Sequence, residues 1–265
     1  MSGNSTLNTH NTQVQFMPCG NLLASMDRSC LLIEGEEVHV WAATLDGSDA
    51  TLEAASHMLD REERARGARF VRDLDRRRYV LAHASVRAIL GRYLDHPPEA
   101  IQVYRAESGK PYLRCPETRG RALCFNLSHS EDRLLLGISR GHEIGIDLEQ
   151  VKDHTDVAGL AARYYSPDEC ERLAVLSPEE RRREFFRYWV AKEAVLKGQG
   201  VGIVSLETCE ILHSERRARA SRRTKRVEAS EPGWTVEWLS CGLEWQAAVA
   251  CSAEDWTVRH MPATD

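Results

Sequence analysis

Acidic residues in two segments of the chain have the types and positions that a divalent cation needs. In residues 144–149 (IGIDLE), apolar residues alternate with Gly145, Asp147 and Glu149. A strand points alternate side chains to opposite faces, so the apolar residues should face the core and both carboxylates the other side. Glu193 follows in a helical segment, WVAKEAVLK. Magnesium binds oxygen ligands octahedrally and shares its shell with water and phosphate, so Asp147, Glu149 and Glu193 are candidate ligands.

Two lysines lie close to the third carboxylate. Lys192 and Lys197 could neutralise phosphate groups in a reaction that develops negative charge. In a simpler interpretation Glu193 merely pairs with Lys197 at i, i+4, a contact that contributes a few tenths of a kcal/mol, and both lysines are solvated. Lys192 shares an apolar stripe with Phe185 and Trp189, where an unpaired ammonium is costly, so we expect it to have a buried partner.

A hydroxyl–imidazole–hydroxyl trio, Ser128, His129 and Ser130, follows a predicted buried strand at 123–127. Placed in a loop, the trio could bind phosphate, although it could equally be an ordinary turn. A Ser–His nucleophile pair is disfavoured because adjacent residues seldom point at each other and no G-x-S-x-G elbow is present. A serine hydrolase is therefore excluded.

Apolar alternation predicts short strands in both halves of the chain. They are expected at 38–42, 123–127, 134–138, 144–149, 234–239 and 244–249. Residues 109–111 (GKP) form a predicted turn, and the last two strands should form a hairpin.

Helices are predicted by capping residues and apolar stripes. Asp60 with Glu63 opens an arginine-rich helix, and apolar residues from Tyr79 to Tyr93 mark a helix that ends before Pro97-Pro98. Ser166 and Ser177 each precede Pro, with Glu three residues after the Ser, and so begin two further helices. The second of these should run over 178–197 and stop at Gly198 and Gly200.

Composition limits the class of protein. The 265 residues carry a net charge of -5, which argues against nucleic-acid binding, and the eight cysteines lack C-x-x-C spacing and are expected to be reduced. No signal peptide or membrane-spanning run is present, so we expect a cytoplasmic protein without membrane association. Residues 1–35 are expected to be a poorly ordered tail, and the basic run 216–226 a solvated loop, which either has no role or steers an acidic partner electrostatically.

The motifs, and their order along the chain, resemble those of the 4'-phosphopantetheinyl transferase superfamily, of the larger surfactin-synthetase-activating (Sfp) type. The resemblance covers roughly residues 38–250 and is carried by the motifs GKP at 109, FNLSHS at 125, GIDLE at 145, YSPDE at 165 and WVAKEAVLK at 189. It implies an α+β fold of two similar subdomains related by pseudo-two-fold symmetry, at 36–142 and 143–265, in a monomer. Glu169, although part of a family motif, is already explained as the capping partner of Ser166.

The resemblance also implies a reaction. The phosphopantetheine arm of coenzyme A would be transferred to a serine of an apo acyl or peptidyl carrier protein, as used in fatty acid, polyketide or nonribosomal peptide synthesis, releasing adenosine 3',5'-bisphosphate. A catalytically idle coenzyme A or carrier-protein binding module and a magnesium-dependent nucleotide pyrophosphate hydrolase are the alternatives.

Site residues follow from the matching motif positions. Magnesium would be held by Asp147, Glu149 and Glu193, with Glu193 also the candidate base and Lys197 assisting catalysis. Coenzyme A would be bound by Arg66, Arg78, Lys110, Pro111, Ser128, His129, Lys192 and Lys197. Among the arginines, Arg64, Arg76 and Arg77 are close rivals of Arg66 and Arg78.

Overall fold

The computed structural model describes residues 13–24, 30–114, 122–212, 217–222, 233–253 and 255–261. Its helices are α1 (Cys19–Ala24), α2 (Asp49–Met58), α3 (Arg61–Gly67), α4 (Asp73–Leu94), α5 (Val157–Tyr164), α6 (Pro167–Ala174) and α7 (Pro178–Gln199), with 3-10 turns η1 (Pro98–Ala100) and η2 (Ile203–Thr208). Its strands are β1 (Met17–Pro18), β2 (Glu37–Thr44), β3 (Val103–Arg105), β4 (Pro111–Leu113), β5 (Leu123–Ser130), β6 (Arg133–Arg140), β7 (Ile144–Gln150), β8 (Cys209–Leu212), β9 (Arg217–Arg222), β10 (Trp234–Leu239), β11 (Trp245–Cys251) and β12 (Thr257–His260).

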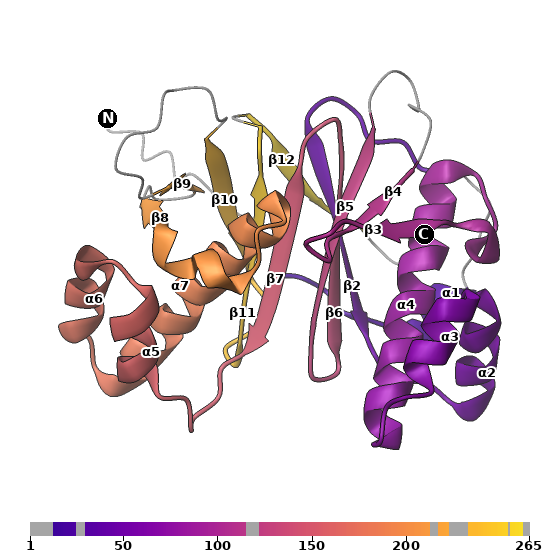
Figure 1. The fold of residues 1–265 in the computed structure, drawn as a ribbon, viewed down its shortest axis with the longest axis horizontal. Coiled ribbons are helices and arrows are strands. Elements are labelled where there is room, and N and C mark those ends of the chain that lie inside the picture. Colours follow the sequence, from indigo (N-terminus) through magenta and orange to yellow (C-terminus); the bar gives the residue numbers. More distant parts are fainter. Residues whose placement is uncertain are drawn as a thin grey trace, which may run out of the picture.

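The two halves repeat one arrangement, which confirms the predicted α+β fold. In the first half the sheet order is β2-β6-β5 and the long helix is α4; in the second it is β7-β11-β10 and the long helix is α7. Neighbouring strands within both trios are antiparallel. In Figure 1 the two sheets lie side by side, with α1–α4 outside one and α5–α7 outside the other.

The apolar face of β7 packs between the two sheets, as its alternation predicted. Ile144, Ile146 and Leu148 are fully buried in a cluster that includes Val40 and Leu135 from the first sheet. Because successive strand residues point to opposite faces, Asp147 and Glu149 lie on the side of β7 that carries α7. Burial of the trio therefore fixes the direction of both carboxylates.

Capping residues in the sequence predicted the ends of three helices correctly. Capping boxes open α3 at Asp60, α6 at Ser166 and α7 at Ser177, and α7 ends at Gly200 in the left-handed conformation. These ends match the predicted ones within a few residues.

The structure corrects two expectations about order. Residues 13–24 are packed: β1 pairs in parallel with β2, and Cys19 of α1 is fully buried against α4. Residues 1–12 and 25–29 of the expected tail lie outside the described residues. Part of the basic run forms strand β9, paired with β10, while residue 216 and residues 223–226 lie outside the described part.

Both terminal segments make contacts across the predicted boundary between residues 142 and 143. Strand β12, near the C-terminus, returns to the first half and pairs in parallel with β2. The backbone N–H of Val14 donates to the carbonyl of Ser240 in the second half. Both terminal segments therefore tie the two halves together.

Candidate active site

Side chains join strands β5 and β7 where the two sheets meet. Asn126 Oδ1 accepts the backbone N–H of Ile146 at 2.9 Å, and Ser128 Oγ accepts that of Leu148 at 3.3 Å. Residues 128–130, which we expected in a loop, are the last residues of β5. Extended pairing along β6 continues the strand three residues beyond the apolar run, so Ser128 and Ser130 share one face with Asn126.

Hydroxyl groups on this face hold the two carboxylates of β7. Ser128 Oγ donates to Asp147 Oδ1 at 2.9 Å, and Ser130 Oγ donates to Glu149 Oε2 at 2.9 Å. The sequence identified these residues, but not their pairing across the junction of the halves.

Two glycines allow α7 to lie directly on β7. A Cβ on Gly145 would lie 1.8 Å from the carbonyl oxygen of Ala194, and one on Gly198 would lie 2.4 Å from the Trp234 ring. Either contact is far inside van der Waals distance. This close approach brings Glu193 and Lys197 of α7 to the carboxylates of β7.

Lys197 links the helix to the strand. Its ammonium group donates to Asp147 Oδ1 at 2.5 Å and to Ser128 Oγ at 3.0 Å. Burial alone would lower the pKa of Lys197, but the charge and hydrogen bond of Asp147 raise it above its usual value. Lys197 is therefore a fixed cation at the edge of the acidic group.

Lys197 does not balance the negative charge of all three carboxylates, Asp147, Glu149 and Glu193. Burial, followed by repulsion from Asp147, raises the pKa of Glu193 to about 7 and also raises the pKa of Glu149. Asp147 Oδ2 is buried and has no hydrogen-bond partner within the described ranges. An additional positive charge would relieve all three groups.

The donor atoms of this site are of the kind that magnesium prefers, but they are not already arranged around one ion position. Hard oxygen donors, an unpartnered buried carboxylate oxygen and raised acid pKa values are what such an ion would exploit. However, across the described residues no three His, Cys, Asp or Glu side chains are grouped closely enough to hold a metal. The predicted gathering of Asp147, Glu149 and Glu193 around one ion is thus not preformed.

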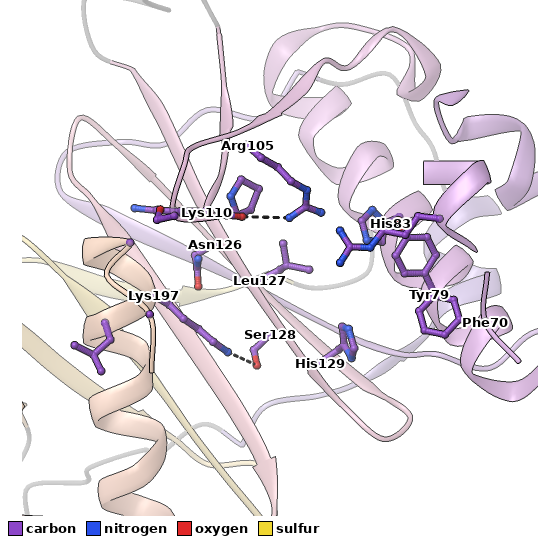
Figure 2. A pocket seen from close by; sticks show the side chains of 17 residues that line it. Phe70, Tyr79, His83, Arg105, Lys110, Asn126, Leu127, Ser128, His129 and Lys197 are labelled. Atoms are coloured by element: carbon purple, nitrogen blue, oxygen red, sulfur yellow. Dashed lines mark hydrogen bonds between the residues drawn. The ribbon is translucent and has the colours of Figure 1, made fainter. Parts of the chain in front are cut away.

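A cleft of about 480 Å³ opens beside this acidic group, between the two halves (Figure 2). Six of the predicted coenzyme A contacts line it: Arg66, Lys110, Pro111, Ser128, His129 and Lys197. Lys110 donates to the Glu143 carboxylate and, at 2.5 Å, to the Gly198 carbonyl, so the GKP turn is fastened to the end of α7. The pKa of His129 is lowered, first by partial burial and then by electrostatic interaction with His83 and Lys197.

Lys192 is a correction to the predicted set. It does not line the cleft: its side chain is fully buried, with Nζ 2.7 Å from Glu169 and 2.6 Å from the carbonyl of Cys209. The prediction of a buried partner from periodicity is confirmed, whereas the phosphate contact implied by the resemblance is not available from this position. Glu169 is structural, as expected, and has this ion pair besides its capping role.

Arg78 is not among the residues that line the cleft, and it pairs with Glu131 at 3.2 Å, although its charge is one of those that lower the pKa of the cleft residue His129. Its rivals are engaged too, because Arg76 pairs with Asp73 and Arg77 with Asp49. Arg66 alone of these arginines lines the cleft.

Sequence reasoning missed four cleft residues that carry aromatic or basic groups: Phe70, Tyr79, His83 and Arg105. Figure 2 shows Tyr79 and His83 across the cleft from Lys197. Tyr79 and His83 are spaced i, i+4 and so share a helix face, a signal that could have identified them.

Comparisons with known proteins agree with this architecture. A family model described as the 4'-phosphopantetheinyl transferase superfamily matches residues 143–250, and one described as 4'-phosphopantetheinyl transferase, N-terminal, matches residues 43–139. The 4'-phosphopantetheinyl transferase HetI of Nostoc sp. is 35% identical over 228 residues, which cover 85% of this chain and 92% of HetI. The 4'-phosphopantetheinyl transferase psf-1 of Bacillus pumilus is 31% identical over 201 residues, covering 76% and 81% of the two chains.

The chain therefore belongs to the 4'-phosphopantetheinyl transferase superfamily and is an enzyme. Separate matches for its two halves agree with the larger, surfactin-synthetase-activating type indicated by the sequence motifs. No helix among the described residues has the length and apolar character to cross a bilayer.

Proposed function

We propose that this enzyme transfers the phosphopantetheine arm of coenzyme A to a serine hydroxyl of an apo acyl or peptidyl carrier protein. The products are the holo carrier and adenosine 3',5'-bisphosphate. The observation that carries the proposal is the position of Lys197, which lines a basic cleft and at the same time pairs with an under-neutralised acidic group. A polyanionic nucleotide and a divalent cation would meet there.

Binding of coenzyme A follows from the charge of the cleft. Arg66, Lys110 and Lys197 supply cationic groups to the phosphates, and His129 supplies an imidazole. Pro111 and Leu127 give apolar surface for the nucleotide. The two halves of one chain complete this cleft, so we propose that the enzyme acts as a monomer.

Magnesium would be held by Asp147, Glu149 and Glu193, and when bound it would polarise the pyrophosphate and stabilise the departing bisphosphate. Lys197 stabilises the same negative charge from the cleft side, since its ammonium group is already held in place by Asp147 and Ser128.

The serine proton needs an acceptor when the hydroxyl attacks the pantetheine-side phosphorus. Glu193, with a pKa raised to about 7, is suited to accept it near neutral pH in the absence of a bound cation. A carboxylate bound directly to magnesium is a weaker base, in which case Glu193 orients the reactants instead.

Mass spectrometry tests the reaction. An apo carrier protein incubated with coenzyme A, magnesium chloride and the enzyme should gain the mass of the phosphopantetheine arm at one serine. Replacing that serine with Ala in the carrier is the matched control. Free phosphopantetheine with an unmodified carrier would identify a pyrophosphate hydrolase instead, and tight coenzyme A binding without either product would identify an idle binding module.

A further inference from the structure

His83 occupies the junction of two hollows and has no part in the reaction described so far. The 480 Å³ cleft adjoins a second hollow of about 430 Å³. Arg66, Tyr79, His83 and Arg105 line both. A group bound at this junction would contact these basic and aromatic side chains, whereas the acidic residues Asp60, Glu62 and Glu63 line only the second hollow.

The imidazole ring of His83 is held in one orientation. Its Nδ1 lies 2.9 Å from Glu63 Oε1, and its ring centroid lies 4.1 Å from that of Tyr79. A carboxylate only accepts hydrogen bonds, so Nδ1 carries a proton in this pair. Nε2 has no hydrogen-bond partner in the described part of the chain, and it can donate to an anionic ligand in the imidazolium form, whose charge is then paired with Glu63.

The second carboxylate oxygen of Glu63, Oε2, is held by two further hydrogen bonds. Arg87, which is 1% exposed, donates from Nε to Glu63 Oε2 at 2.6 Å, and the backbone N–H of Asp60 donates to the same oxygen at 3.1 Å. Burial alone would raise the pKa of Glu63, but the contacts with His83 and Arg87 lower it, so the group is a carboxylate at neutral pH. The pair is therefore organised before any ligand binds.

The surrounding charges favour a phosphate group. Arg66 and Arg105 border the same space, and the charge of His83 helps to lower the pKa of His129 across the cleft. Within the proposed function, the pyrophosphate of coenzyme A lies at the Lys197 end, opposite His83 (Figure 2). The remaining phosphate of coenzyme A is the monoester on its ribose.

We propose that His83 Nε2 binds the ribose 3'-phosphate of coenzyme A, and that Glu63 is the positioning residue that orients this imidazole. The inference rests on the proposed function for the identity of the ligand. It adds to the reaction a residue that selects the phosphorylated nucleotide over its 3'-dephospho form.

Calorimetric titration with adenosine 3',5'-bisphosphate and with adenosine 5'-monophosphate isolates this contact, because the two nucleotides differ only in the 3'-phosphate. His83→Asn keeps an amide that can reach Glu63 but removes Nε2. It should weaken bisphosphate binding about tenfold, the loss expected for one hydrogen bond to a charged group, and change monophosphate binding less than about twofold. His83→Gln, which places an amide near the Nε2 position, should recover part of the loss.

Controls separate positioning from folding. His57→Gln replaces an exposed histidine of α2 that lines neither hollow and should leave both affinities unchanged. Glu63→Ala should reduce the preference for the bisphosphate, and Glu63→Gln, which keeps an acceptor for Nδ1, should restore it. A purely structural role for Glu63 predicts a lower melting temperature with no change in that preference.

Equal losses for both nucleotides in His83→Asn would overturn the inference, because His83 would then contact the part that they share. Unchanged affinities would overturn it as well. The titration needs no carrier protein, so it is independent of the transfer assay. Failure of the wild type to modify any carrier would count against the proposed function, whereas transfer with an unaltered 3'-phosphate preference in His83→Asn would count only against this contact.

Discussion

Replacing Lys192 with Met distinguishes a structural lysine from a phosphate ligand. The side chain of Lys192 is fully buried, pairs with Glu169 at 2.7 Å and donates to the carbonyls of Tyr164 and Cys209 at 3.2 and 2.6 Å. Met preserves the length of the apolar stem but provides no charge. Glu169, also buried, would lose its ionic partner.

The expected cost follows from that loss. Breaking a buried ion pair by removing one partner destabilises a protein by about 3 to 5 kcal/mol, because an uncompensated charge stays buried. For a chain of this size, such a loss lowers the melting temperature by about 10 °C. Combining Lys192→Met with Glu169→Gln should be less harmful, since no unpaired charge then remains and Gln can still cap the helix at Ser166.

Urea unfolding and coenzyme A titration at a temperature where the variants are folded measure the two properties separately. We expect a lower free energy of unfolding and a coenzyme A dissociation constant within about twofold of the wild type. Lys152→Met is the matched control, because Lys152 is only partly buried and its surface ion pair with Glu131 contributes at most about 1 kcal/mol. A tenfold weaker affinity with unchanged stability would refute the reasoning and return Lys192 to the phosphate site.

Four further predictions concern the site. Gly145→Ala should destabilise the fold by about 3 kcal/mol in urea unfolding, since its Cβ would meet the Ala194 carbonyl; wild-type stability would contradict the close packing of α7. Asp147→Asn should lower the transfer rate at least about a hundredfold while retaining coenzyme A binding, and an unchanged rate would remove the metal assignment. Because protons compete with a cation for Glu193, whose pKa is about 7, magnesium affinity should be about tenfold weaker at pH 6 than at pH 8; a flat profile would show that Glu193 is not a ligand. Arg78→Ala should change coenzyme A affinity less than about threefold by titration, and a larger loss would place Arg78 at the ligand.

Sequence patterns predicted most elements because their causes are local. Capping residues such as Ser166 and Ser177 bond to backbone groups within three residues, so the helix starts are determined by short segments. Alternation in residues 144–149 gave the buried face of β7, since strand geometry fixes the side of each residue. Order in residues 13–24 was missed because it comes from pairing with β2, a distant strand that a polar local composition does not reveal.

The sequence by itself determined the family, the repeated α+β arrangement and the acidic residues at Asp147, Glu149 and Glu193, because ordered motifs and strand periodicity are properties of the chain alone. Only the tertiary structure decided which cation each acidic group meets. Lys192 and Lys197 lie five residues apart on α7, and a helix turns about 100° per residue, so they point to different neighbours. One is enclosed with Glu169 in the core, and the other reaches Asp147 at the cleft because two glycines let helix and strand touch.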